Sequence, residues 1–292
     1  MFMSLRARLF YDDLATVEPT MQDKPGLVVN FTIYDDLADS TAELGETTDV
    51  EVVALSDSQT SVTIREYGNA VLSTAKLRGS TFDPTFNPHA ANIVGRNAAQ
   101  SIDTICRDVL HGGTNVSYIS QTARTSLVAT NTITASAIRE QVANLRAANV
   151  DTWDERYFGS IHPHVAVDLR EQTGAASWTA PVNYSDAVRR WKGEVGTFEG
   201  VGFVETPRSP IFANGGAGTV DAYATLIVGK EAMAKAYSST VSAARPQVVL
   251  GPVTDRLKRF VPVGWYWMGG YARFREEALR RIESASSIGA NA

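Results

Sequence analysis

Two stretches rich in β-branched and aromatic residues near the N-terminus constrain the fold of this 292-residue chain more than any other feature. They read LVVNFTIYDDL and TSVTIREYGNAVLSTAKL, and together they predict one long hairpin over residues 27–75 with a turn at residues 56–58. Two arms of about 24 residues would reach on the order of 80 Å, whereas a compact body of this length is about 50 Å across. Part of the hairpin must therefore overhang its own body.

The overhanging part of this hairpin cannot bury much apolar surface within its own chain. An isolated two-stranded ribbon is only marginally stable in water, and the tip offers few large apolar side chains. We therefore expect the tip to become fully ordered only against another subunit. The apolar residues concerned are Val50, Val52, Val53 and Leu55.

The composition is that of an ordinary globular protein, with 44% hydrophobic and 20% charged residues and a formal net charge of -5. This charge argues against a protein that grips a nucleic acid backbone, because that task needs clustered, uncompensated Lys and Arg. Cys106 is the only cysteine, which excludes an intramolecular disulfide framework and a Cys-rich zinc cluster. No run approaches the roughly 18 apolar residues of a membrane-spanning helix, and the basic N-terminus does not resemble a signal peptide. We therefore expect a soluble protein made in the cytoplasm.

One long helix is predicted after the hairpin. Residues 1–26 are polar and are interpreted as an arm. Asn87 is a suitable N-cap, Pro88 suits the first helical turn and Gly112 supplies a stop, which predicts a helix of about 35 Å over residues 88–111. Cys106 lies on this helix and is interpreted as a small core residue. The predicted apolar face consists of Ala90, Val94, Ala98, Ile102, Ile105 and Val109.

A mixed region follows a Ser/Thr-rich link at residues 114–132, which marks a predicted boundary. We expect a helix over residues 134–149 with Ile138, Val142 and Leu145 facing inward, then a buried strand that leads into a short helix over residues 163–173. EVGTFEGVGFVETP predicts a hairpin, AYATLIVG a strand, KEAMAKAY a short helix, and FVPVGWYWMGGYARFREEALRRIE a strand-like run that ends in charged residues. The intermixed helices and strands predict an α+β protein.

The stretch IHPH contains His162 and His164 and raises the question of a metal site. No helix carries the H-E-x-x-H spacing that places two ligands on one face. Pro163 fits the first position of a helix, so the simpler interpretation makes His162 the residue that caps this helix. The chain also lacks a G-x-S-x-G elbow and a complete phosphate-binding loop. The sequence therefore offers no catalytic constellation.

Six short patterns follow one another along the chain, and their order is more specific than any one of them. They are AELGE at 42–46, IREYGNAV at 64–71, IHPHVAVDLR at 161–170, EVGTFEGVGFVETP at 194–207, YATLIVGKEA at 223–232 and VGWYWMGGYARF at 263–274. This series resembles the major capsid protein family of tailed phages typified by coliphage N-four, which has the Hong Kong 97-type fold. In one departure, GWYWMGG stands where the family would have Gly-Trp-Lys, so no role of that lysine is carried over.

The resemblance implies a division of the chain and a function. It implies an N-terminal arm at 1–26, a peripheral domain at 27–133 with an extended loop at about 38–62 and a spine helix at about 88–111, an axial domain at 134–249, and a return strand and tail at 250–292. The implied function is that of a major capsid protein that self-assembles into hexamers and pentamers of an icosahedral shell. The shell would enclose double-stranded DNA and contact it non-specifically, and no membrane, cofactor or enzymatic role is implied.

The resemblance also implies where subunits touch and which partners they meet. Contacts between subunits are implied at Arg6, Arg8, Arg96 and Arg107 of the arm and spine helix, and on the extended loop at Glu46, Asp49, Val52, Val53 and Leu55. Scaffolding, portal and decoration proteins are the further partners implied. Because there is no room before residue 27 for a long cleaved segment, we expect a separate scaffolding protein or none. Synthesis and assembly would take place in the host cytoplasm, and the product would be the virion capsid.

Two alternatives stay open at this point. An encapsulin-type cellular nanocompartment has the same fold but encloses cargo enzymes, so co-purifying cargo protein would favour it. A metal-dependent hydrolase that uses His162 and His164 is the enzyme alternative, and stoichiometric zinc or nickel in the purified protein would favour that one.

Overall fold

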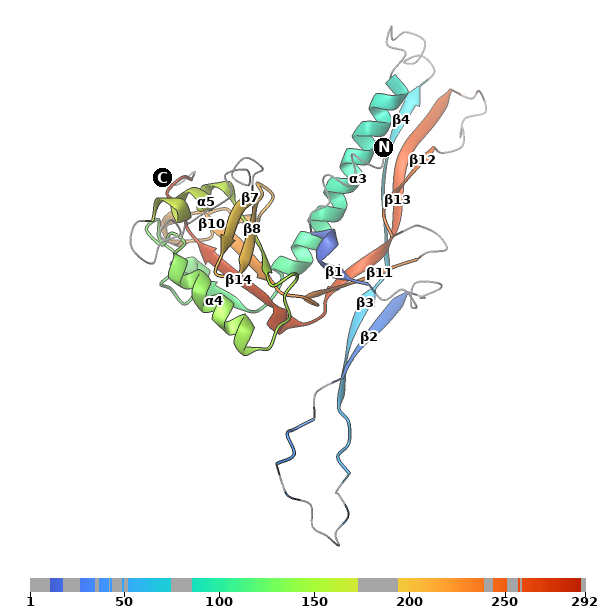
Figure 1. The fold of residues 1–292 in the computed structure, drawn as a ribbon. Coiled ribbons are helices and arrows are strands. Elements are labelled where there is room, and N and C mark those ends of the chain that lie inside the picture. The colour runs from blue at the N-terminus through green and yellow to red at the C-terminus, as the bar shows by residue number, and fades with distance from the viewer. Residues whose placement is uncertain are drawn as a thin grey trace.

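A computed structural model describes residues 11–17, 27–34, 37–41, 43, 49, 52–74, 86–172, 194–238, 244–250, 257 and 259–289. Its strands form a seven-stranded sheet, a five-stranded sheet and a separate two-stranded hairpin. Figure 1 shows an extended molecule: a body with two helices lies to one side, a long helix rises beside the five-stranded sheet, and the hairpin points away from both. The predicted mixture of helices and strands is confirmed.

The seven-stranded sheet forms the core of the body with two helices, which we call the first body. Its order is β5 (Val116–Tyr118), β14 (Leu279–Ser284), β10 (Ala222–Val228), β6 (Tyr157–Ile161), β8 (Val201–Glu205) and β7 (Glu194–Phe198), and β9 (Ile211–Phe212) also pairs with β10. The 3-10 turns η3 (Arg124–Ser126) and η5 (Ala217–Thr219) lie in its connections. Every residue of β10 is buried, since this strand is paired on both edges and covered by side chains.

Two helices accompany this sheet. In α4 (Ala135–Ala147), the Thr134 hydroxyl accepts a hydrogen bond from the Ala137 N–H, and Ile138, Val142 and Leu145 are buried as predicted. The expected strand-to-helix junction is also present, because β6 is followed by α5 (Pro163–Glu171). The β7–β8 hairpin and the β10 strand are confirmed as well.

The five-stranded sheet packs against the long helix α3 (Phe86–His111). Together they form the second body of the subunit. The central strand of this sheet is β13 (Phe260–Arg273), which pairs along one edge with β4 (Arg65–Thr74) and along the other with β12 (Gln247–Leu250) and β11 (Met233–Tyr237). β1 (Ala15–Thr16) then pairs in parallel with β11, directly after the short turn η1 (Asp12–Leu14). Trp267 is fully buried within the apolar core that this sheet shares with α3.

The long helix was predicted well, with two corrections. It begins at Phe86, so Asn87 lies inside the helix and is not its cap. The predicted Val94, Ala98 and Ile102 are buried, but the buried face continues through Cys106 and Leu110, while Ile105 and Val109 are only half-buried. The interpretation of Cys106 as a core residue is confirmed.

The predicted long hairpin is shorter than expected. β2 (Val28–Tyr34) and β3 (Asp57–Thr63) pair over seven residues each, and residues 65–74 then leave the hairpin to pair with β13 instead. Residues 57 and 58 belong to β3, so the turn predicted there is wrong. Phe31 and Val62 pack with Ala234 and Ala236 of β11, which attaches the base of the hairpin to the five-stranded sheet.

One further expectation fails because burial overrides local preference. KEAMAKAY was expected to be helical, but Met233–Tyr237 is strand β11, held between β1 and β13. The strand-like C-terminal run is confirmed as β13, and its charged end contains a further strand, β14. Consequently the sheets do not follow the ranges 134–249 and 250–292: β11 and β12 lie in the five-stranded sheet, whereas β5 and β14 lie in the seven-stranded one.

Candidate assembly surfaces

The connection between β2 and β3 exposes apolar side chains far from either sheet. Val52, Val53 and Leu55 expose 94, 71 and 59% of their surface, and Figure 1 shows the coloured parts of this connection extending beyond the end of the hairpin. Asp49 is described but Glu46 lies outside the described residues. Such a cluster of exposed apolar groups is typical of a protein-protein contact.

A shallow groove of about 770 Å³ lies on the five-stranded sheet. Gly68, Ala70 and Gly264 line it together with Val249 and Pro262, and Val249 is 46% exposed. The glycines are required by close packing of the strands, since a Cβ on Gly68 would lie 2.9 Å from the Trp265 carbonyl oxygen. Trp265, Tyr266 and Asn69 line the same groove, so small apolar residues and aromatic ones together form a shallow surface against which an extended segment can lie.

The four arginines expected at contacts between subunits fall into three groups. Arg6 and Arg8 lie outside the described residues. Arg96 is exposed on α3. Arg107, in contrast, faces its own chain, because its guanidinium pairs with Asp108 and donates from Nη1 to the Arg208 carbonyl oxygen at 3.1 Å.

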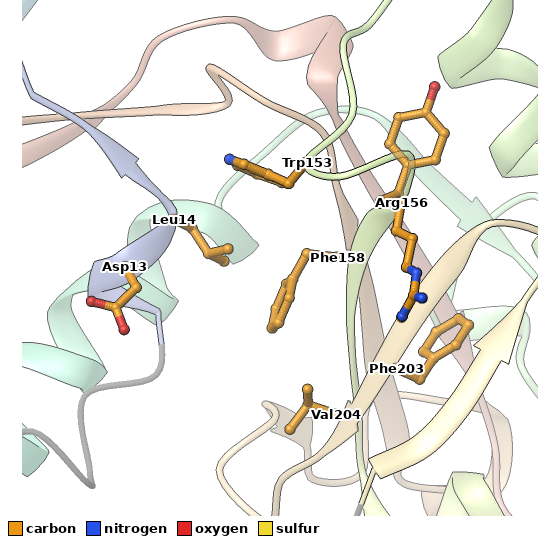
Figure 2. A pocket seen from close by; sticks show the side chains of 9 residues that line it. Asp13, Leu14, Trp153, Arg156, Phe158, Phe203 and Val204 are labelled. Atoms are coloured by element: carbon orange, nitrogen blue, oxygen red, sulfur yellow. The ribbon is translucent and has the colours of Figure 1, made fainter. Parts of the chain in front are cut away.

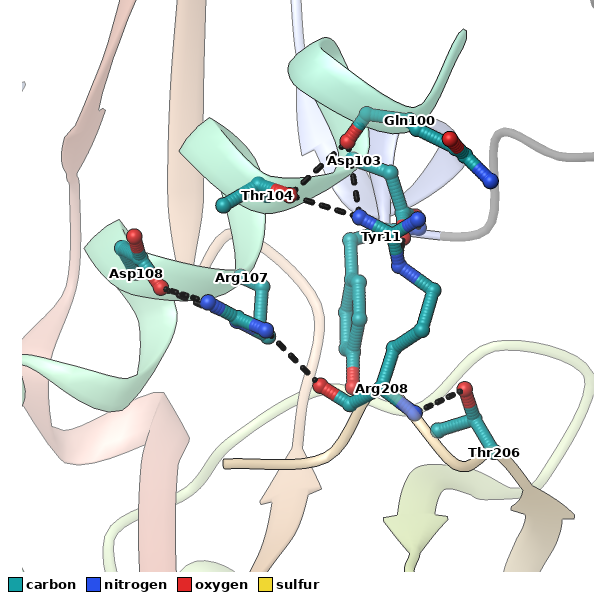
Figure 3. Close-up of polar contacts among 8 residues, drawn as sticks. All are labelled: Tyr11, Gln100, Asp103, Thr104, Arg107, Asp108, Thr206 and Arg208. Atoms are coloured by element: carbon teal, nitrogen blue, oxygen red, sulfur yellow. Dashed lines mark hydrogen bonds and ion pairs between the residues drawn. The ribbon is translucent and has the colours of Figure 1, made fainter. Parts of the chain in front are cut away.

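Asp103 is the centre of a polar junction between the long helix and the first body (Figure 3). Its carboxylate is 1% exposed and pairs with Arg208, with 2.7 Å between Nε and Oδ2. Arg208 Nη2 also donates to the Gln100 carbonyl oxygen at 2.7 Å and to the Thr104 hydroxyl at 2.6 Å. The backbone N–H of Tyr11 donates to Asp103 Oδ1 at 3.4 Å. Sequence analysis did not identify Arg208, because its partners lie about a hundred positions away and no local pattern marks the contact.

A cleft of about 350 Å³ lies beside η1 and the first body (Figure 2). Asp13 and Leu14 of η1 form one side of it, and Trp153, Phe158 and Val204 lie opposite. Its lining is mostly apolar. The cleft shows that the segment after residue 11 does not fill all the space between the two bodies.

Two buried ionic clusters hold the sheets internally. Lys235 of β11 pairs with Asp12 at 2.5 Å, and the Tyr271 hydroxyl donates to the same carboxylate oxygen. Burial is the main reason why the pKa of Tyr271 is raised well above its usual value. In the seven-stranded sheet, fully buried Glu283 accepts two hydrogen bonds from Arg124, at 2.6 and 2.7 Å, and pairs with Arg281 at 2.9 Å. Charges inside a protein are stable only when paired in this way.

The two histidines of IHPH adjoin each other without forming a metal cluster. Their ring centroids are 4.7 Å apart, and His164 Nδ1 lies 3.2 Å from the Tyr223 hydroxyl. Burial, and then the neighbouring His164, lower the pKa of His162 to about 4. Among the residues that the structure describes, no three His, Cys, Asp or Glu side chains gather to hold a metal ion. Within the same ranges, no helix is long and apolar enough to cross a membrane.

Comparison with known structures identifies the fold. The chain is similar to the capsid protein of Ralstonia phage GP4, with a TM-score of 0.79 and 15% identity over 99% of this chain and 92% of that one. It is also similar to the capsid protein of cyanophage Pam1, with a TM-score of 0.75 and 15% identity over 97 and 91% of the two chains. A third match is the head protein of Helicobacter pylori bacteriophage KHP40, with a TM-score of 0.65 and 12% identity over 94 and 89%. The expected Hong Kong 97-type fold is thus confirmed.

Comparison by sequence identifies the family. A search of curated protein sequences found no match. A family model described as phage capsid protein, however, matches residues 12–288, which is nearly the whole chain. This range includes both sheets, the long helix and the hairpin with its exposed loop. The chain therefore belongs to the phage capsid protein family and is a major capsid protein.

Proposed function

We propose that this major capsid protein assembles as hexamers and pentamers into an icosahedral shell around the double-stranded DNA of a tailed phage. The observation that carries the proposal is the loop between β2 and β3, whose apolar side chains extend away from their own subunit. Burying one such side chain at a contact stabilises it by about 1.5–3 kcal/mol. Many copies in a closed shell sum such modest contacts into a stable assembly.

The division into domains follows the sheets better than it follows the chain. We propose that the seven-stranded sheet with α4 and α5 is the axial domain, which would gather around the centres of hexamers and pentamers. The five-stranded sheet with α3 would be the peripheral domain, and residues 1–26 would form the N-terminal arm. β5 and β14 would then belong to the axial domain, and β11 and β12 to the peripheral one, a division that their pairing supports.

The extended loop would contact a neighbouring copy, and Glu46, Asp49, Val52, Val53 and Leu55 are its proposed contact residues. The groove over Gly68 and Ala70 offers a surface of matching chemistry for this loop, because it is shallow and lined mostly by small apolar and aromatic residues. On the proposed spine helix, Arg96 is exposed and suits a contact between subunits. Arg107 suits that role less, because it is engaged within its own subunit.

The remaining parts of the proposal concern partners and place. A net charge of -5 suits a container that must hold DNA without binding it tightly. We propose a structural rather than an enzymatic role, assembly in the host cytoplasm, and portal, scaffolding and decoration proteins as partners. The encapsulin-type and hydrolase alternatives are not favoured, since the family is that of phage capsids and His162 acts as a helix cap.

The test is assembly of the purified chain, alone and together with the other head proteins of its phage, followed by electron microscopy. We expect closed shells with five- and six-fold capsomers. A chain that stays monomeric under all these conditions would contradict the proposal. Shells that enclose a cargo enzyme encoded beside this chain would support the nanocompartment instead.

The loop contact has its own test, because buried Cys106 leaves introduced cysteines as the only accessible thiols among the described residues. In the variant Val53→Cys with Ala70→Cys, a short bismaleimide should link neighbouring copies into covalent rings on a denaturing gel. Val53→Cys with Ile93→Cys is the matched control, because Ile93 is exposed on α3 rather than in the groove. Linking by the control pair alone would show that the loop contacts the helix instead.

A further inference from the structure

The two bodies of the subunit are joined by chain crossings that lie close together. In the described chain, the backbone passes between them at 112–115, 229–232 and 274–278. The crossings are bonded to one another: the Gly229 N–H donates to the Ala278 carbonyl oxygen at 2.7 Å, and the Phe274 N–H to the Ala232 carbonyl oxygen at 2.9 Å. The Thr114 hydroxyl donates to Glu276 Oε1 at 3.0 Å. All covalent links between the bodies in this part of the chain therefore meet at one place, as at a pivot.

Asp103 lies on α3 at a distance from this pivot. Gly112 lies nine positions further along the chain, which corresponds to about 13 Å along a helix. Arg208 reaches Asp103 from the segment that follows β8, so the ion pair joins the five-stranded side to the seven-stranded side. A contact this far from a pivot fixes the angle between the two bodies. For a lever of about 13 Å, a displacement of about 2 Å at the contact turns one body by roughly 9°.

The contact is built to hold one geometry. Arg208 Nη2 donates to two acceptors on α3, the Gln100 carbonyl oxygen and the Thr104 hydroxyl, and the Arg208 guanidinium forms an ion pair with the Asp103 carboxylate. Charge-assisted bonds to a planar fork are strong and directional. Arg107 bonds in the opposite direction, from α3 to the Arg208 carbonyl oxygen (Figure 3). Helix and segment therefore hold each other at both ends of Arg208.

Apolar packing is continuous between the two bodies, but it leaves one part of this junction open. The cleft between Leu14 and Val204 leaves about 350 Å³ unfilled beside it (Figure 2). A filled interface would resist a small rotation through steric contact, whereas a cleft tolerates it. The polar contacts at Asp103 therefore restrain the angle where apolar packing leaves the junction open.

We propose that Arg208 and Asp103 set the angle between the two bodies and thereby the curvature, and hence the diameter, of the assembled shell. The inference rests on the proposed assembly function, because curvature is a property of the shell. Its physical basis is that, in the proposed shell, contacts between subunits would lie on both bodies. The angle between the two bodies sets the orientation of one subunit contact relative to the next. A change in that angle in every copy therefore changes the radius at which the shell closes.

The experiment compares particle diameters by cryo-electron microscopy. Arg208→Met removes the charge and the planar fork, and we expect its particles to have a broader or shifted diameter distribution than the wild type. Arg170→Met is the matched control, because Arg170 pairs at 3.3 Å with Glu205 inside the seven-stranded body alone. We expect the control particles to keep the wild-type diameter. An unchanged diameter for Arg208→Met would overturn the inference.

A second control separates the angle from general stability. Ile138→Val weakens the buried core of α4 without touching the junction. If it broadens the diameters as much as Arg208→Met does, the effect is one of stability and the inference is wrong. If Arg208→Met is insoluble, Arg208→Lys replaces it, because this variant keeps the charge but loses the planar fork. We expect Arg208→Lys to broaden the diameter distribution too. An unchanged diameter would overturn the inference. Uniform shells from every variant would overturn this inference alone, whereas a wild-type chain that forms no shells would overturn the proposed function as well.

Discussion

The imidazole Nδ1 of His162 accepts a hydrogen bond from the backbone N–H of His164 at 3.2 Å. This bond caps α5 at its N-terminus, where Pro163 occupies the first turn and the next N–H groups lack helical partners. An imidazole nitrogen that accepts this hydrogen bond must be unprotonated, which agrees with the lowered pKa of His162. The histidine pair is thus explained by the start of a helix at the end of a buried strand.

Replacing His162 with Ala should destabilise the subunit by about 0.5–2 kcal/mol, because the cap is lost. His162→Asn should retain most of that stability, since an amide oxygen can accept the same hydrogen bond. Urea unfolding of the dissociated subunit at pH 7 measures both. Equal losses for Ala and Asn would show that the ring packs against Tyr223 rather than caps the helix.

The features predicted correctly from sequence depend on neighbours along the chain. The inward positions of α4 and the junction at Pro163 arise from residue spacing within or next to one helix. β11 was mistaken for a helix because Ala, Lys and Met favour one locally. Pairing with β1 and β13, and the burial of Lys235 on Asp12, override that preference. The contacts with β1 and Asp12 join residues more than 200 positions apart and leave no local pattern.

His111 should make the subunit sensitive to acid. Its ring is buried, and burial first, then Arg281 and Arg107, lower the pKa of its imidazole from 6.5 to about 3. A folded-state pKa below the unfolded value means that the unfolded chain binds the proton more readily. The stabilisation of the folded subunit that comes from neutral His111 is therefore fully present above about pH 6.5 and is lost as the pH falls towards 3. Between pH 7 and pH 5 the free energy of unfolding should fall by on the order of 2 kcal/mol.

The test replaces His111 with Leu, which cannot bind a proton. Neither ring nitrogen has a hydrogen-bond partner within the described part of the chain, so the substitution breaks no such bond there. Free energies of unfolding at pH 7 and pH 5 should differ less in His111→Leu than in the wild type, by about the amount given above. If both proteins lose the same stability, the acid response comes from other groups.

Buried Glu283 explains why the charged segment at the C-terminal end forms strand β14. Arg280, Arg281 and Glu283 make β14 look like an exposed tail, yet Glu283 is fully buried between Arg124 and Arg281. Glu283→Ala would leave two arginines without their shared partner, and we expect a loss of about 3–5 kcal/mol. Urea unfolding measures it. Arg139→Met, which removes a partly exposed ion pair with Glu199, should cost less than about 1 kcal/mol, and equal losses would mean that burial of the pair does not matter.

Substitutions in the exposed loop should weaken assembly of the shell without destabilising the subunit. Changing Val52, Val53 and Leu55 together to Ser should alter the unfolding free energy of the subunit by no more than about 0.5 kcal/mol each, because these side chains are exposed there. The same change should raise the protein concentration needed for assembly by at least tenfold, since a loss of about 1.4 kcal/mol per contact is enough. Sedimentation of assembly mixtures measures that concentration. Val128→Ser with Ile211→Ser, which removes exposed apolar groups from the first body, is the control. If the loop variant assembles as readily as this control, the loop does not hold neighbouring subunits together, because its apolar side chains would then be as exposed in the shell as they are in the free chain.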